Sequence, residues 1–228
     1  METQICKTCL FGGVLFAAGL ASAQSFSIQD DRPLNPGAMP ATVASQAYAF
    51  ASLDGVTNYA FELRPDDINH TVTSASGSGE LVASNSFQPT ELRGDLDWNG
   101  SGSATGGVLA SVGFQVDVNA TGIASWDVSG MASFGASSYF GVYTYDAGGF
   151  IIPVFERDFD GSISGMIDPL SGIENISLEA GRQYIAEWTI NGVPNVDAAQ
   201  FVSLQLIPAP GAAGLLAVAG FVGVRRRR

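Results

Sequence analysis

The segment between residues 24 and 206 contains neither cysteine nor lysine, because the two cysteines and the one lysine of the 228-residue chain, Cys6, Cys9 and Lys7, all lie near its N-terminus. The absence of thiols excludes disulfides, thiolate metal sites and cysteine nucleophiles from this segment. The chain has a single histidine, His70, so a Ser-His-Asp triad would depend on that one residue. We therefore predict a protein that is not an enzyme and has no cofactor.

Positive charge is also scarce. In the segment 24–206, five arginines face 21 acidic residues, which gives a formal net charge of −16. A field of this sign repels the phosphates of nucleic acids and of anionic lipids. Nucleic-acid binding is therefore excluded as a function.

The N-terminal residues 1–23 have the pattern of a secretory signal peptide. Lys7 precedes an apolar run of twelve residues, and Ala21 and Ala23 then form the small-x-small pattern that signal peptidase reads. We expect cleavage between Ala23 and Gln24. The alternative is an N-terminal membrane anchor, although the run is short for a hydrocarbon core of roughly 30 Å.

The middle of the chain, residues 24–206, has the length of one domain. Helical periodicity is almost absent, and short runs alternate apolar with polar residues between Asp-Gly, Gly-Gly and Asn-Gly pairs that suit hairpin turns. The predicted inward rows include Phe114, Val116, Ala124, Trp126, Tyr184, Ala186, Trp188, Ile190, Val202, Leu204 and Leu206.

About ten such strands predict an all-β fold, a single antiparallel β-sandwich of jelly-roll or immunoglobulin-like topology. A closed barrel is the alternative. Further strands are expected at 43–51, 56–63, 79–87, 139–145, 150–155 and 161–167, and the Gly/Ser-rich stretches 74–79 and 100–107 are expected to be surface loops.

One acidic stretch has the spacing of a metal-binding loop. Asp95, Asp97 and Asn99 occupy alternate positions ahead of a glycine, and Ser103 occupies the ninth position of the pattern. This is the first half of a calcium loop, in which side-chain oxygens converge on the ion. The twelfth position is Gly106 instead of a bidentate Glu, so an acidic hairpin turn without an ion is the favoured alternative.

Trp98 lies inside the same stretch. It is the one tryptophan that falls outside the predicted apolar rows, whereas Trp126 and Trp188 fall on them. If the domain is a lectin-like module, we predict that Trp98 is exposed and contacts the ligand.

The last 22 residues have the pattern of a segment that inserts into a membrane. Fourteen helical residues span about 21 Å, which is short of a bilayer core, so the expected hydrophobic helix would insert but anchor poorly. The terminal arginines would stay on the cytoplasmic side. The residues that carry this pattern are Pro208, Ala209, Pro210, the apolar run from Gly211 to Val224, and Arg225, Arg226, Arg227 and Arg228.

This ending resembles the PEP-CTERM sorting signal of bacterial surface proteins, which combines a Pro-x-Pro motif, an apolar helix and an arginine cluster. Ala209 departs from the commonest motif, which has Glu there. The resemblance implies that residues 207–228 are recognised and processed by an exosortase, a membrane protease-transpeptidase. It also implies a transient membrane anchor and a final location in the envelope or on the outer surface, in association with exopolysaccharide and biofilm. A plain C-terminal anchor is the alternative.

These features predict an exported bacterial cell-surface or matrix protein with a structural or adhesive β-sandwich, whose partners are signal peptidase, exosortase and envelope components. A module that binds exopolysaccharide is the first alternative. A glycoside hydrolase is the second, because such enzymes need only two carboxylates facing each other across a cleft. The candidate pairs are Asp66 with Asp67, Asp95 with Asp97, and the series Glu156, Asp158 and Asp160.

Overall fold

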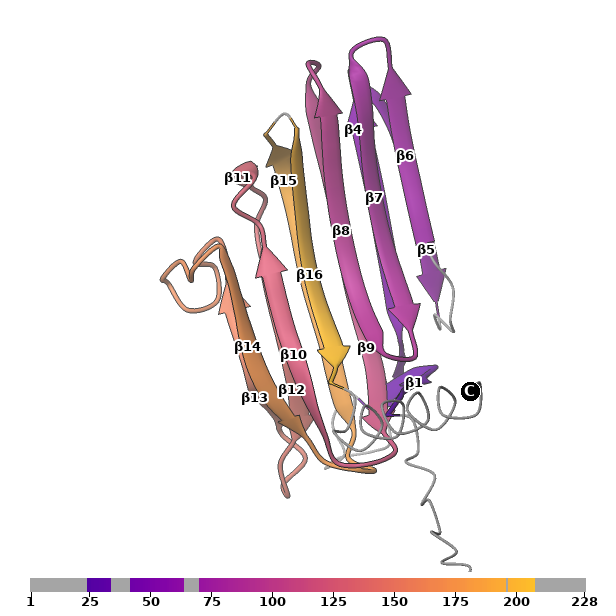
Figure 1. Cartoon of the computed structure of the whole chain (residues 1–228), viewed down its shortest axis with the longest axis vertical. Helices are drawn as coiled ribbons and strands as arrows, with labels where there is room; N and C mark the ends of the chain where they lie inside the picture. The colour runs from indigo at the N-terminus through magenta and orange to yellow at the C-terminus, as the bar shows by residue number, and fades with distance from the viewer. Residues whose placement is uncertain (1–23, 34–41, 64–69, 196, 208–228) are drawn as a thin grey trace, which may run out of the picture.

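The protein is an all-β molecule built from two antiparallel sheets that pack face to face (Figure 1). The computed structural model describes residues 24–33, 42–63, 70–195 and 197–207. None of these residues belongs to a helix long and apolar enough to cross a membrane. The prediction of an all-β fold with antiparallel sheets is confirmed, and the two facing sheets agree with a β-sandwich.

The first sheet has eight strands. Its main path runs β13-β12-β15-β9-β4-β5, with β1 paired to β9 and β11 paired to β15. The strands are β1 (Phe26–Gln29), β4 (Gln46–Leu53), β5 (Val56–Leu63), β9 (Ala104–Val116), β11 (Met131–Phe134), β12 (Tyr139–Tyr145), β13 (Ile151–Asp158) and β15 (Tyr184–Pro194).

The second sheet has six strands in the order β14-β10-β16-β8-β7-β6, and a separate hairpin pairs β2 with β3. The strands are β6 (His70–Ser76), β7 (Gly79–Gln88), β8 (Glu91–Gly100), β10 (Ala120–Asp127), β14 (Ser171–Leu178), β16 (Ala198–Leu206), β2 (Asp31–Pro33) and β3 (Thr42–Ala44).

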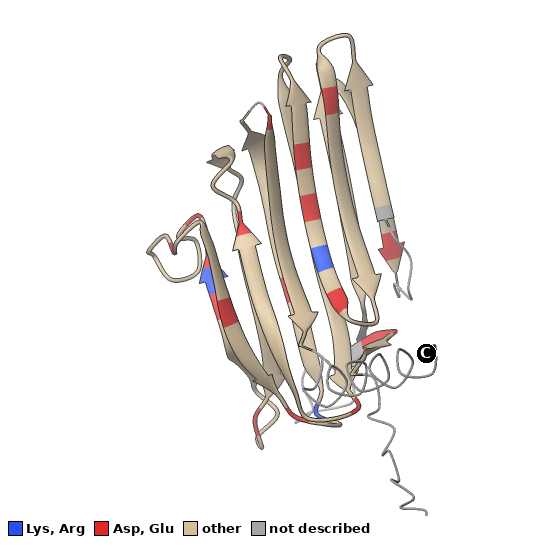
Figure 2. Cartoon of the chain, in the orientation of Figure 1, with Lys and Arg blue, Asp and Glu red and all other residues tan. Residues whose placement is uncertain are grey.

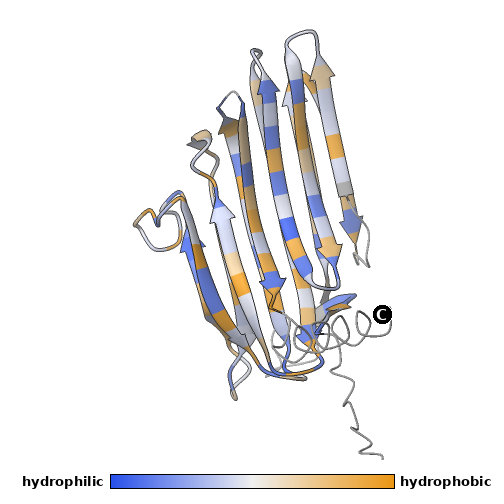
Figure 3. Ribbon diagram, viewed as in Figure 1, coloured by the Kyte–Doolittle hydropathy of each residue, from blue (hydrophilic) through white to orange (hydrophobic). Residues whose placement is uncertain are grey.

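The core lies between the two sheets, and the alternation of the sequence positions it. Apolar and polar residues follow each other along the strands of the second sheet (Figure 3), as a strand that buries one face requires. The predicted inward residues Phe114, Trp126, Trp188, Val202 and Leu204 are all buried, each at most 5 % exposed. The prediction of these rows is confirmed.

A buried amide ties the two sheets together at the centre. Asn85 of β7 accepts a hydrogen bond from the indole N–H of Trp188 at 2.9 Å. Its amide donates to the carbonyl oxygens of Tyr48 and Leu109 at 3.0 and 3.3 Å. Gly94 of β8 leaves room for the indole ring, since a Cβ at that position would overlap Trp188. A fully buried polar side chain is thus satisfied entirely by groups of the opposite sheet.

Side-chain contacts bridge the two long edges of the sandwich. At one edge, Asn58 of β5 donates to the carbonyl oxygen of Thr73 at 2.8 Å, and Ser74 of β6 donates to the carbonyl oxygen of Val56 at 3.0 Å. At the other edge, Arg157 of β13 forms an ion pair with Glu174 of β14. These bridges hold the edge strands of one sheet against those of the other, which limits their availability for pairing with a foreign strand.

Both ends of the described sandwich meet at one hairpin turn. The backbone N–H of Phe26, at the start of β1, donates to the carbonyl oxygen of Pro89 at 2.6 Å. The N–H of Leu206, at the end of β16, donates to the carbonyl oxygen of Thr90 at 2.9 Å. Because Pro89 and Thr90 form the β7–β8 turn, the chain enters and leaves the sandwich at the same end.

Several predicted boundaries are wrong. Residues 161–167, expected to be a strand, form a loop between β13 and β14. The stretch 100–107, expected to be a loop, reduces to three residues because β9 already begins at Ala104. The stretch 74–79 is likewise only a tight turn, since β6 extends to Ser76 and β7 begins at Gly79. The described residues also form sixteen strands instead of about ten.

Candidate functional site

The residues predicted to form a calcium loop form a regular strand instead. Asp95, Asp97 and Asn99 occupy successive outward positions of β8, while Leu96 and Trp98 point into the core. Alternate residues of a strand lie roughly 7 Å apart, so their oxygens spread along the strand and do not surround one point. The loop and hairpin-turn conformations predicted for this stretch are therefore wrong, and Ser103 lies beyond the end of β8.

The outer face of β8 is a row of paired charges, visible along that strand in Figure 2. Arg93 forms an ion pair with Asp95 at 2.7 Å, and Glu91 lies 3.7 Å from the same guanidinium. Hydrogen bonding to Asp95 raises the pKa of Arg93. The guanidinium also lies over the ring of Phe201, 4.6 Å from its centroid. No cluster of three or more His, Cys, Asp or Glu side chains suited to a metal occurs among the residues that the structure covers.

The prediction that Trp98 is exposed is wrong. Its side chain is 1 % exposed and belongs to the hydrophobic core. The ligand contact that we predicted at this residue is therefore lost, and with it the sequence-based argument for a lectin-like module.

Asp158, one of the carboxylates considered for glycoside hydrolysis, organises a loop. Burial would raise its pKa, but hydrogen bonds from the backbone of Ser164 and Ile163 outweigh this effect and lower the pKa to about 2. Its oxygens accept the N–H groups of Gly161, Ile163 and Ser164 at 2.9, 2.8 and 2.7 Å. Asp168 in turn accepts the N–H of Asp158 at 2.8 Å. The carboxylate therefore holds the β13–β14 loop in shape.

The other carboxylates considered for catalysis are also engaged or lie elsewhere. Glu156 accepts the hydroxyl of Tyr143 at 2.8 Å, and burial together with this hydrogen bond raises the pKa of Tyr143. Asp160 accepts the backbone N–H of Ser162 at 2.9 Å. Asp66 and Asp67 lie outside the described residues.

The most distinctive exposed surface is one that the sequence patterns did not reveal. Four aromatic residues, Tyr48 and Phe50 of β4 with Tyr59 and Phe61 of β5, point outward from the eight-stranded sheet and form two cross-strand pairs, Tyr48 with Phe61 and Phe50 with Tyr59. Tyr59 is 71 % exposed and Phe61 is 53 % exposed. We call these four residues the aromatic platform.

The rings of the platform lie side by side at small angles to one another. The centroid of Tyr48 is 5.9 Å from that of Phe50, with an angle of 31° between the planes. It is 6.4 Å from that of Tyr59, at 32°. At these angles the rings do not meet edge to face.

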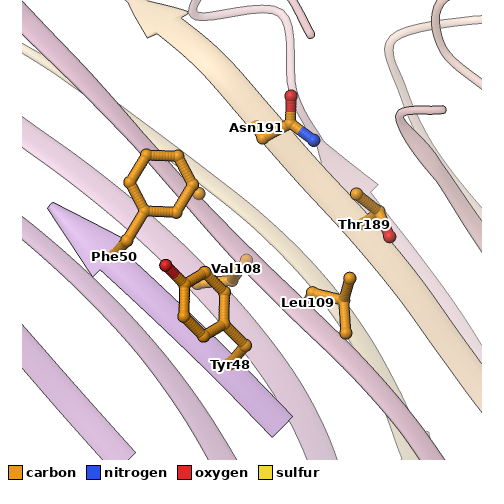
Figure 4. Close-up of a pocket in the computed structure, with 7 residues that line it drawn as sticks. Tyr48, Phe50, Val108, Leu109, Thr189 and Asn191 are labelled. Atoms are coloured by element: carbon orange, nitrogen blue, oxygen red, sulfur yellow. The ribbon is translucent and has the colours of Figure 1, made fainter. Parts of the chain in front are cut away.

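A shallow hollow of about 120 Å³ adjoins the platform. Tyr48 and Phe50 line one side of it, and Thr189 and Asn191 of β15 line the other (Figure 4). Gly107 of β9 lies between them, paired with Phe50 on one side and Asn191 on the other. A Cβ at this glycine would come within 2.6 Å of the Phe50 ring and 2.7 Å of Asn191, so the absence of a side chain keeps the hollow open.

The packing of β4 explains why the aromatic residues face outward. Three of the four inward positions of this strand are alanines, Ala47, Ala49 and Ala51, and the fourth is Leu53; all are fully buried. Strand β4 lies close to β6 and β7 of the opposite sheet, and small side chains permit that approach. The large rings of the same strand then have no place in the core and lie on the surface.

The residues of the predicted processing signals lie mostly outside the described part of the chain. Ala21 and Ala23 of the signal peptide are among these, as is the sorting segment from Pro208 to Arg228. Searches of protein-family models, of curated proteins and of solved structures found no match to this chain.

Proposed function

We propose that this chain is an exported bacterial surface or matrix protein, sorted to the envelope by its two terminal segments, with a non-enzymatic, structural or adhesive β-sandwich. The predicted signal peptide and the resemblance of the ending to PEP-CTERM signals motivate the sorting part of the proposal. Signal peptidase and an exosortase are the processing partners that it requires.

One observation supports it most directly. Strand β16 lies between β10 and β8 in the interior of its sheet, ends at Leu206, and is followed directly by the predicted sorting segment, residues 207–228. The N–H of Ile207 still donates to the carbonyl oxygen of Thr121 at 2.9 Å. A processing enzyme that cuts at or after Pro208 would leave every strand of the sandwich intact.

The common position of the two ends of the described sandwich is consistent with this arrangement. Attachment through the residues after Ile207 would hold the molecule by the end that carries the β7–β8 turn. The opposite end, with the β4–β5 and β6–β7 turns, would then point away from the attachment point (Figure 1). This geometry suits a domain that displays its sides and its far end to the surroundings.

We further propose a jelly-roll rather than an immunoglobulin-like arrangement. From β13 onward the chain changes sheet at each step, through β14, β15 and β16. Repeated crossing between the two sheets is the wiring of a jelly roll, whereas immunoglobulin domains join several neighbouring strands within one sheet.

The intact mass of the protein recovered from its native cell surface tests the sorting proposal. We expect a species that begins at Gln24 and ends between Pro208 and Gly211, with or without an attached group. A double variant, Pro208→Ala with Pro210→Ala, should keep its C-terminal arginines and stay in the membrane fraction. Arg228 still present on the mature wild-type protein would contradict the proposal.

A further inference from the structure

The outer face that contains the aromatic platform carries no charged residue over β4 and β5, over the part of β9 that pairs with β4, and at Thr189 and Asn191 of β15. The register places fourteen outward residues there, and none of them is ionisable at neutral pH. They are Gln46, Tyr48, Phe50 and Ser52 of β4, Thr57, Tyr59, Phe61 and Leu63 of β5, Thr105, Gly107, Leu109 and Ser111 of β9, and Thr189 and Asn191 of β15. The acidic residue Glu187 of β15 is the register partner of Ser111 and borders this neutral set.

This neutrality is unusual in a domain with a formal net charge of −16 between residues 24 and 206. An exposed aromatic surface of this kind indicates a binding site more often than an accident of packing. Its partner must tolerate the strongly negative field of the rest of the molecule. That field disfavours nucleic acids, anionic lipids and a second copy of the same acidic chain, all of which would be repelled.

We propose that the aromatic platform and the adjoining hollow bind a neutral polysaccharide. The apolar C–H face of a pyranose ring stacks on an aromatic face, and the side-by-side rings of Tyr48, Phe50 and Tyr59 offer several such faces. The amide of Asn191 and the hydroxyl of Thr189 line the hollow, where they are placed to hydrogen-bond sugar hydroxyls. An uncharged polymer meets no electrostatic penalty on this face.

The rigidity of the platform favours such binding. Asn85 holds the backbone carbonyls of Tyr48 and Leu109 from the inside of the sandwich. The strand that carries two of the four rings is therefore fixed before the ligand arrives, so little conformational entropy is lost on binding. The inference names the partner of the adhesive domain and in that sense rests on the proposed function.

Affinity electrophoresis of the exported protein tests the proposal, with hydroxyethyl cellulose, laminarin and dextran as neutral probes and alginate as the anionic one. We expect at least one neutral polymer to retard the wild type. The double variant Tyr59→Ala with Phe61→Ala should weaken that binding by about tenfold or more. Tyr59→Phe keeps the ring and should retain most of the binding.

A matched control separates loss of the site from loss of the fold. Ile173 of β14 is 72 % exposed on the other sheet, so Ile173→Ala removes a similarly exposed apolar side chain and should leave retardation unchanged. Tyr59 and Phe61 are exposed, so their removal should leave the thermal unfolding midpoint near that of the wild type.

Three results would overturn the inference: no retardation by any neutral polymer, equal retardation of the double variant, or stronger retardation by alginate. A double variant that changes the oligomeric state without changing retardation would also overturn it, in favour of self-association through this face. Because processing is measured separately by intact mass, a correctly processed protein that binds none of the neutral polymers contradicts the polysaccharide site alone. A protein that binds but keeps Arg228 contradicts the sorting proposal alone.

Discussion

The two outer faces of the sandwich cover the same core with opposite chemistry. Strand β8 of the six-stranded sheet presents Glu91, Arg93, Asp95 and Asp97 in an unbroken outward row, whereas β4 and β5 of the eight-stranded sheet present rings and neutral polar groups. Outward positions contribute little to the core, so folding alone does not require the difference. The charged face keeps the domain soluble, and the neutral face leaves a surface that an uncharged partner can approach.

The largest expected effect on stability comes from removing the buried amide that links the two sheets. Asn85→Leu removes the partner of the Trp188 indole and of two carbonyl oxygens in the buried centre. Buried groups left without a partner cost roughly 1 to 3 kcal/mol, so we expect unfolding free energy to fall by about 3 kcal/mol. Denaturant unfolding measures it. Ser84→Ala, one position away on the outward side of β7, should change stability by less than about 0.5 kcal/mol. Equal effects of the two substitutions would refute the role of the amide.

A second substitution acts where the chain passes from one sheet to the other. Asp158→Asn leaves the β13–β14 loop without the charged acceptor of three backbone N–H groups, and we expect a loss of about 2 kcal/mol. Asp127→Asn, an acidic residue at the end of β10, serves as the matched control and should cost less.

The same residue predicts a pH dependence. The pKa of Asp158 is about 2 in the folded protein, below the value of roughly 3.9 in an unfolded chain. The folded state is therefore favoured by the ionised form, and this contribution is fully present above about pH 4 and is lost as the pH falls toward 2. Thermal unfolding of wild type and Asp158→Asn between pH 5 and pH 2 should converge, and parallel curves would show that the carboxylate has no such role.

The two faces should also respond differently to salt. Tyr48→Ala removes ring contacts with Phe50 and Tyr59, and we expect a loss of about 1 kcal/mol that stays the same at high ionic strength. Unfolding curves at 0.05 and 1 M sodium chloride provide the measurement. A loss that disappears in salt would mean that the aromatic face is stabilised electrostatically.

The smallest effect belongs to the charged face. Arg93→Ala breaks an exposed ion pair with Asp95, which we expect to cost about 0.5 kcal/mol at low salt. The loss should shrink at 1 M salt, because the screening length falls from about 10 Å at 0.1 M to about 3 Å there. If the cost persists in salt, then the contact of the guanidinium with the Phe201 ring contributes more than the ion pair.

The alternation of residues was enough to predict the fold class and the inward rows, because one buried face imposes a period of two on each strand. The prediction from alternation failed in one stretch, where two different sets of residues both alternate. In the stretch from Asp95 to Asn99 the acidic residues alternate as calcium ligands do, and Leu96 and Trp98 alternate with them as core residues do. The buried leucine and tryptophan were the stronger signal, since burying them stabilises the strand.

The aromatic platform could not be found by assigning the large apolar residues to the core. In β4 the alanines are buried and the aromatic residues lie outside. That inversion depends on how closely β4 approaches the second sheet, a property of strand order that no local pattern encodes. One clue was available: both strands alternate alanine with aromatic residues around Tyr48 and Phe61, and an Asp-Gly turn makes them a hairpin.

The interior position of β16 has a mechanical consequence. If the molecule is held through the residues after Ile207 and pulled through a polymer on its side, the load runs along β16 toward its C-terminal end. That strand is laddered on both sides, to β10 and to β8. Such a load shears many hydrogen bonds at once, whereas an edge strand would be peeled away one bond at a time. The tether is thus joined to an interior strand of this sheet and not to an edge strand.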